Sequence, residues 1–227
     1  MATHPTLLEQ EIMSDIDERR DLMFRLKALS PRYHFLPEDE ALFLNYSIPI
    51  VYSIWEGFIQ TSFQIYIREL NELNLTINHI CDRIFLYHIE SKFPQFKDYP
   101  QKDNFSKKVK FFEQLGQFYQ SNTLEISAKV NTESNVSFKV LNRILNDFKL
   151  ETIPTHPEPN SNYSLQDDLD KFLLKIRNDV AHGQNSIVVN REDLERSIKL
   201  VDRLMDLVFE RIKTGFITKS YRKDSGH

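Results

Sequence analysis

Apolar residues in this chain recur every three or four positions, and this spacing constrains the fold more than any other feature of the sequence. The clearest run lies near the C-terminus and consists of Leu194, Ile198, Val201, Leu204, Met205, Val208 and Ile212. Such a run forms one continuous stripe on an α-helix and no single face of a β-strand. Only five glycines occur among 227 residues, which disfavours a turn-rich β fold. The sequence therefore predicts an all-α protein, a bundle of antiparallel helices with additional peripheral helices.

Residues that start or stop helices set the expected boundaries. A first helix runs from about residue 7 to Ser30 and Pro31, and a second covers residues 37–73, where Pro49 should kink it or split it in two. Further helices are predicted over residues 76–93, 105–121 and 136–148. Residues 122–134 have no clear assignment. Residues 153–162 form a loop, because three prolines within six residues exclude a helix.

Two helices are expected to close the domain and to pack antiparallel, because a short link joins them. The first is capped by Ser164 and ends at His182, where Gly183 can adopt the left-handed conformation that terminates a helix. Asn190 caps the second. We expect a single helical domain over residues 1–214, followed by a basic tail over residues 215–227 that can be flexible.

Bulk properties limit the environment and the partners. The single cysteine, Cys81, excludes an internal disulfide and suits a reducing compartment. Residues 1–10 lack the pattern of a signal peptide, and no apolar stretch approaches the roughly 20 residues that cross a bilayer. We therefore expect a cytoplasmic protein without membrane contact. The net charge of −4 gives no global positive field, so any contact with nucleic acid should be local.

The most concentrated chemistry lies in Arg177-Asn178-Asp179-Val180-Ala181-His182-Gly183. A histidine exchanges protons near neutral pH, and an arginine can hold two phosphate oxygens through its planar set of donors. Together they can act on a phosphodiester without a metal. The structural alternative is a cationic histidine that merely favours the negative end of its helix.

The spacing poses a geometric problem. On an ideal helix Arg177 and His182 point about 140° apart and lie about 7.5 Å apart along the axis, so one helix does not direct both at one atom. Asn178 and His182, in contrast, share a face. Either the last turn is distorted at Gly183, or a second copy supplies the missing half across a two-fold axis. We favour the second route, because it gathers two arginines and two histidines in one cleft.

This segment resembles the signature of the HEPN superfamily, in which an arginine and a polar residue are followed after a short interval by a histidine. Within the superfamily the chain is most similar to the bacterial RiboL-PSP-HEPN group, through the motif, the segment Ser53-Ile54-Trp55-Glu56-Gly57-Phe58 and residues 135–150. The resemblance covers about residues 40–212 and leaves out the first helix and the tail.

The resemblance implies an all-α homodimer that cuts RNA without a metal or other cofactor, often as a toxin with a cognate antitoxin or as an antiphage effector in a defence system. His182 would then act as general acid or base and Arg177 would stabilise charge in the transition state. Asn178 would position one of them, and Asp179 would cap the helix or pair with a cation. Other members of the superfamily are catalytically silent modules that bind proteins, nucleotides or RNA, and this remains the main alternative.

Glu56 is the second position of interest, because it shares a helical stripe with Tyr52, Ile59 and Phe63. An inward-pointing carboxylate would need a partner, and Arg177 is the candidate. The alternative is an exposed glutamate at the edge of the helix. The tyrosines and Trp55 occur at helical spacing and are interpreted as core.

Metal chemistry has little support in the sequence. His79, Cys81 and His88 do not match the spacing of a tetrahedral zinc site. Asp167, Asp168 and Asp170 could bind a cation, but acidic residues are expected in the first turn of a helix. Metal-dependent action on DNA or nucleotides is therefore the weakest hypothesis.

Overall fold

The computed structural model describes residues 5–93, 105–120, 124–157, 163–183 and 188–223. These ranges are helical apart from loops and one isolated β-bridge between Ile80 and Arg222, so the all-α prediction is confirmed. The elements are α1 (Leu7–Tyr33), α2 (Pro37–Glu72), α3 (Asp82–Lys92), α4 (Phe105–Gln120), α5 (Phe138–Asp147), the π-helical η2 (Asp167–Leu174), α6 (Lys175–Ala181) and α7 (Arg191–Ile217).

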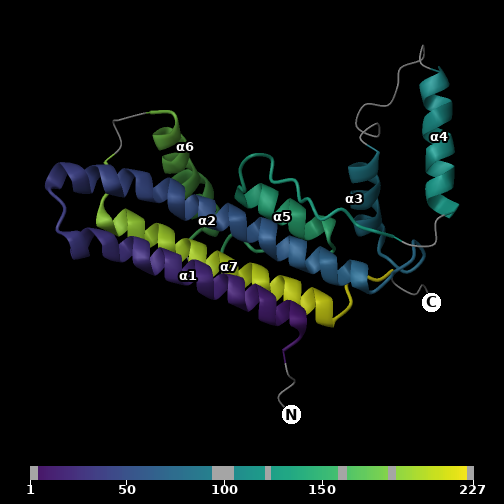
Figure 1. The fold of residues 1–227 in the computed structure, drawn as a ribbon, viewed down its shortest axis with the longest axis horizontal. Coiled ribbons are helices and arrows are strands. Elements are labelled where there is room, and N and C mark those ends of the chain that lie inside the picture. The colour runs from purple at the N-terminus through teal and green to yellow at the C-terminus, as the bar shows by residue number, and fades with distance from the viewer. Residues whose placement is uncertain (1–4, 94–104, 121–123, 158–162, 184–187, 224–227) are drawn as a thin grey trace.

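Three long helices, α1, α2 and α7, lie side by side and form the body of the protein (Figure 1). α2 and α7 run in the same direction and α1 runs against both. The helix that carries the motif consists of η2 and α6. It does not lie antiparallel along α7 as expected: only η2 packs against α7, while α6 packs mainly against α2 and rises away from the bundle.

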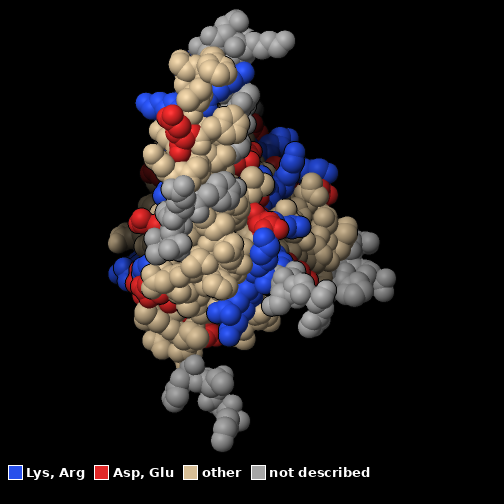
Figure 2. Space-filling view, turned by 90° about the vertical axis from the view of Figure 1, so that its right-hand side faces the viewer, with Lys and Arg blue, Asp and Glu red and all other residues tan. Residues whose placement is uncertain are grey.

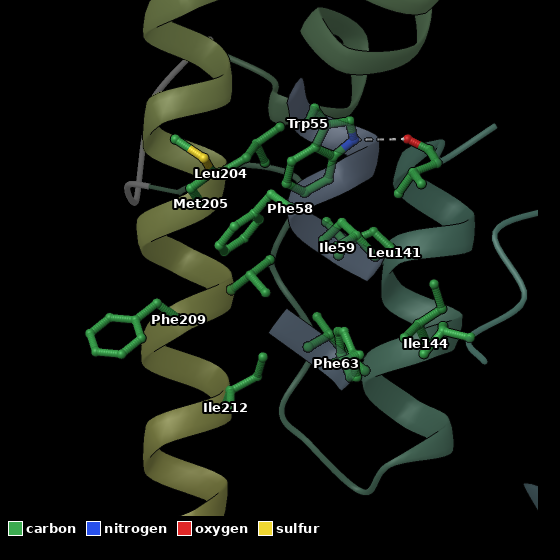
Figure 3. Close-up of a cluster of buried hydrophobic side chains, with 14 of the residues drawn as sticks. Trp55, Phe58, Ile59, Phe63, Leu141, Ile144, Leu204, Met205, Phe209 and Ile212 are labelled. Atoms are coloured by element: carbon green, nitrogen blue, oxygen red, sulfur yellow. Dashed lines mark hydrogen bonds between the residues drawn. The ribbon is translucent and has the colours of Figure 1, made fainter. Parts of the chain in front are cut away.

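The core is centred on the aromatic side chains of α2. Trp55, Phe58 and Phe63 are fully buried between α7 on one side and α5 on the other (Figure 3). The indole Nε1 of Trp55 donates a hydrogen bond to the backbone oxygen of Val136 at 3.2 Å, so its one polar atom is satisfied. This packing fixes the middle of α2, the part of the protein on which the motif helix rests.

The predicted ends of the long helices are correct in some places and wrong in others. Asn190 caps α7 in a capping box: its side chain accepts from the backbone N–H of Asp193, and the side chain of Asp193 accepts from the backbone N–H of Asn190. α1 does not stop at Pro31 but continues to Tyr33, with Pro31 inside its last turn. Pro49 does not split α2, which is continuous over 36 residues.

The third helix begins later than predicted. Residues 76–81 form a turn, and α3 starts at Asp82. The backbone N–H of Cys81 donates to the oxygen of Tyr221 at 2.8 Å, and the N–H of Lys223 donates to the oxygen of His79 at 3.0 Å. Residues 215–223, which we expected to belong to a tail, are therefore part of the fold: α7 continues to Ile217, and the side chain of Tyr221 is buried.

α4 extends from the side of the molecule next to α3 (Figure 1) and begins at Phe105 as predicted. Ile89 and Phe93 pack against its Phe111, in a cluster separate from the main core. Viewed from this side, basic and acidic side chains lie in small groups between uncharged ones, so this face has no broad basic field (Figure 2). No helix within the described ranges is both long enough and apolar enough to span a membrane.

Candidate active site

The first half of the motif helix is firmly attached to the rest of the protein. Leu169 and Leu173 are fully buried, and the carboxylate of Asp168 forms an ion pair with Arg196 of α7. Asp170 accepts a hydrogen bond from the backbone N–H of Phe138, at the start of α5, at 2.8 Å. Ser164 caps the helix as predicted, since its hydroxyl accepts from the N–H of Asp167. The π-helical geometry of η2 was not expected.

The second half, α6, ends as a regular helix. The N–H of His182 donates to the oxygen of Asn178 at 2.9 Å, the normal bond between residues four apart. Gly183 then adopts a φ of 72°, the left-handed conformation predicted for it. His182 is the first residue outside helical geometry, with φ −90° and ψ 8°, but its N–H keeps the regular bond to Asn178, and within the described ranges no contact joins its imidazole to Arg177.

Arg177 is held in place by two neighbours. Its Nη1 donates to the side-chain oxygen of Asn178 at 2.8 Å, and its Cζ lies 5.0 Å from the centre of the Tyr52 ring in a cation–π contact. Tyr52 is buried, and its hydroxyl accepts a hydrogen bond from the N–H of Val136 at 2.7 Å. The guanidinium group therefore rests on a ring that is itself fixed between α2 and the segment before α5.

Sequence reasoning missed the role of Tyr52 and assigned it to the core alone. Tyr52 is buried as expected, but its ring also contacts the guanidinium group of Arg177, which is distant in the sequence. Burial raises the pKa of the Tyr52 hydroxyl to about 12, and the neighbouring charge of Glu56 contributes to the same direction. The hydroxyl is therefore protonated at neutral pH and serves as a structural group.

Glu56 does not pair with Arg177 in this structure. Its carboxylate accepts a hydrogen bond from the hydroxyl of Thr132 at 3.3 Å, and no ion pair joins it to a described cation. Because Glu56 is only half-buried, its charge does not require a cation for compensation. Glu56 and Arg177 instead both lie close to Tyr52, and their charges shift its pKa in opposite directions.

His182 and Asp179 make few contacts. His182 is exposed, and its imidazole has no hydrogen bond to the described part of the chain. Asp179 is half-buried, and within the same ranges it neither pairs with a cation nor caps the helix with its side chain. Asn178 and Asp179 line a shallow groove together with Asp170, Lys171, Leu174 and Lys175. The groove lies along the open side of the motif helix.

The described residues include no group of three or more His, Cys, Asp or Glu side chains that could hold a metal ion. The aspartates at the start of the motif helix have protein partners instead: Asp167 pairs with Lys171 at 2.8 Å, and Asp168 and Asp170 bind as described above. Cys81 is buried, and burial raises the pKa of its thiol. His79 hydrogen-bonds Thr76 at 2.8 Å.

The described residues form an all-helical domain in which Arg177, Asn178 and His182 lie at the end of the helix that precedes α7. A model of the RiboL-PSP-HEPN family matches residues 14–214, and the chain belongs to this family. HEPN domains are often nucleases. The match includes most of α1, which the resemblance was expected to leave out. No curated protein and no solved structure matches the chain.

Proposed function

We propose that this protein is an endoribonuclease that works as a homodimer and needs no metal ion. The observation that carries the proposal is that one helix end presents both a fixed arginine and an exposed histidine. Arg177 is held by Tyr52 and Asn178, and the side chain of His182, at the end of the same helix, is exposed to solvent. A fixed cation can stabilise developing negative charge, and an accessible imidazole can transfer protons.

The chemistry would proceed by attack of a ribose 2′-oxygen on the adjacent phosphorus. One His182 accepts the proton of the 2′-hydroxyl while the oxygen–phosphorus bond forms. The bond from phosphorus to the 5′-oxygen then breaks, and a protonated His182 donates a proton to that leaving oxygen. Arg177 binds the non-bridging phosphate oxygens as they gain charge. The products are a cyclic 2′,3′-phosphate and a 5′-hydroxyl.

A dimer would supply the convergence that one helix lacks. Beside α6, α2 exposes an apolar strip of Leu42, Tyr46 and Ile50, whose side chains are 59%, 58% and 46% exposed. Val188, 84% exposed, follows the motif and lies near the first half of α2, since the N–H of Val189 donates to the side-chain oxygen of Asn45 at 3.1 Å. A two-fold partner that covered this strip would bring two copies of α6 together. Tyr46→Glu should therefore give a monomer by light scattering and abolish cleavage.

The enzyme is tested with purified protein and total RNA, with and without EDTA. Cleavage should persist with the chelator and vanish in Arg177→Ala and in His182→Ala. Arg25→Ala and His79→Ala, which change exposed residues far from the motif in sequence, are the matched controls and should cut like the unmodified protein. RNA left intact by the unmodified protein would contradict the proposal, and so would cleavage that EDTA stops.

The shared site is tested by mixing the two inactive variants. In a mixed dimer, Arg177→Ala still supplies His182 and His182→Ala still supplies Arg177. If one cleft uses residues from both chains, the mixture should regain part of the activity that each variant lacks alone. No recovery, together with proven exchange of subunits, would show that each chain works independently.

One observation favours a second function, that of a silent binding module. α4 exposes Phe105, Val109 and Phe112 on the side away from Phe111, an apolar face suited to a protein partner. In the nuclease proposal this face suits the antitoxin or another defence protein that would control a toxin or antiphage effector. In the silent module it would be the main site of action, and total RNA would remain intact.

A further inference from the structure

A cavity of about 640 Å³ lies farther along α2 from Tyr52 and Glu56, where Gln60 and Gln64 are among its lining residues. It is bounded by α2, α3, α5 and the segment before α5, with Gln60, Gln64, Tyr87, Lys129 and Arg143 among its lining residues. This volume falls within the range of sites that hold small molecules or single groups of a larger ligand. The proposed cleavage chemistry gives this cavity no role.

Three charged groups of the cavity are paired with one another. Arg143 binds Asp147 at 2.9 Å and Glu133 at 3.2 Å, and it also donates to the backbone oxygen of Asn131. Arg83 donates to the backbone oxygen of Asn146 at 3.2 Å. Because the lining holds three cations (Arg83, Lys129, Arg143) and three carboxylates (Glu90, Glu133, Asp147), its net charge is zero and it offers little attraction to a phosphate. Its ligand should be polar and uncharged.

Two amides and an aromatic ring are among the groups of the cavity that can bind a ligand. The side chains of Gln60 and Gln64 are exposed and form no hydrogen bond with the described ranges. The hydroxyl of Tyr87 donates to the backbone oxygen of Lys129 at 2.7 Å, which fixes its half-buried ring in the cavity wall. Unpaired nucleobases are recognised by this combination, with amides on their polar edges and aromatic rings on their faces.

The cavity is joined to the candidate active site through α2. Tyr52, Glu56, Gln60 and Gln64 follow one another at four-residue intervals, so they form one ridge on the helix. Tyr52 lies under Arg177, Glu56 binds Thr132, and Thr132 lines the cavity. Along the helix, Gln60 is about 12 Å from Tyr52. A short length of single-stranded RNA can bridge this distance.

The rim of the cavity has an unusual backbone. Glu133 and Ser134 are consecutive non-glycine residues with φ values of 51° and 64°. Such left-handed conformations are uncommon for these residue types and recur where a segment clamps a ligand. The left-handed backbone of Glu133 and Ser134 is therefore maintained by the packing of the surrounding residues.

We propose that this cavity binds one unpaired base of the RNA, next to the nucleotide that is cut, and so gives the enzyme a base preference. The inference rests on the proposed function for its substrate. Gln60 and Gln64 read the edge of the base, and the ring of Tyr87 supports its face.

The test uses oligodeoxynucleotides that contain a single ribonucleotide, because the reaction needs a 2′-hydroxyl and can then occur at one position only. The base at each flanking position is varied in turn, and cleavage rates are compared. The unmodified protein should prefer one base at one position. In the double variant Gln60→Ala, Gln64→Ala this preference should fall about tenfold, the usual contribution of a pair of hydrogen bonds to a base edge. Gln114→Ala, an exposed glutamine on α4, is the matched control and should keep the preference.

The outcomes separate the two proposals. Cleavage without any base preference, or with a preference that the double variant retains, overturns the base site and leaves the nuclease intact. If the unmodified protein does not cut, binding of the same oligonucleotides is measured by fluorescence anisotropy. A base-dependent affinity that the double variant loses then supports the base site without the nuclease, and affinity that does not depend on the base overturns both.

Discussion

The two halves of the motif helix differ in how they are attached to the protein. η2 buries Leu169 and Leu173 and binds α7 and α5 through its aspartates. α6 has no fully buried residue, and Arg177 is fixed mainly through its own side chain. The candidate active-site residues Arg177, Asn178 and His182 all lie in or directly after the second half. The comparison indicates that one half anchors the helix and the other presents reactive groups, at a surface that a second subunit can cover.

The largest expected effect separates chemistry from folding. His182→Ala should lower the cleavage rate by about a thousandfold, the usual loss of a general acid or base. The free energy of unfolding should stay within about 0.5 kcal/mol of the original value, because an exposed side chain is removed. Single-turnover cleavage and urea denaturation measure the two quantities. A large loss of stability would mean that the second half of the helix is structural as well.

The next effect concerns stability and compares equivalent truncations in the two halves. Leu173→Ala should lower the free energy of unfolding by about 3 kcal/mol, because it leaves a cavity in the core. Val180→Ala, in the half-buried part of α6, should cost less than about 1 kcal/mol. Urea denaturation checks both. Equal losses would remove the distinction between the halves.

Tyr52 tests how Arg177 is held. Tyr52→Phe keeps the ring under the guanidinium group but leaves the N–H of Val136 without its acceptor, so it should cost about 1–2 kcal/mol of stability with little change in kcat. Tyr52→Leu removes the ring as well and should lower kcat about tenfold further, with a smaller change in KM. Equal kcat values in the two variants would rule out a positioning role for the ring.

The smallest expected effect is a pH dependence of the free energy of unfolding, caused by Asp170 of η2. Burial raises the pKa of Asp170, and the hydrogen bond from Phe138 opposes this shift only in part. The folded protein therefore binds the proton more tightly than the unfolded chain, and stability should fall as the pH rises from about 3.9 through the raised pKa. Asp170→Asn keeps an acceptor for Phe138 and should flatten this slope. Urea denaturation between about pH 3 and 7 compares the two proteins, and an unchanged slope would exclude Asp170 as its source.

Much of the fold could be predicted because its signals are local. The apolar stripe of α7, the capping residue Asn190 and the terminating Gly183 each act within a few positions of the chain, and each does so as expected. Pro31 misled the boundary of α1, because a proline near a helix end is tolerated there. The late start of α3 depends on Tyr221, a partner distant in sequence that no local pattern reveals.

The candidate site was only partly predictable for the same reason. Arg177, Asn178 and His182 could be selected because they form a short motif in one segment. The contacts that position Arg177 come from Tyr52 on another helix, and Glu56, the predicted partner, is bound by Thr132 instead. Choosing among neighbouring residues of α2 requires the rotation of that helix against α6, which depends on packing across the whole bundle.

The backbone hydrogen bonds between residues 79–81 and 221–223 join the start of α3 to the C-terminal segment, at the far end of the molecule from the motif. The family match stops at residue 214, before residues 221–223 that make this contact. A protein that ended at residue 214 would retain α1 and α2 whole and α7 almost complete, and would still release the start of α3. Proteolysis of such a truncated chain would then cut first near residue 80, and α4 with its apolar face would lose its fixed orientation.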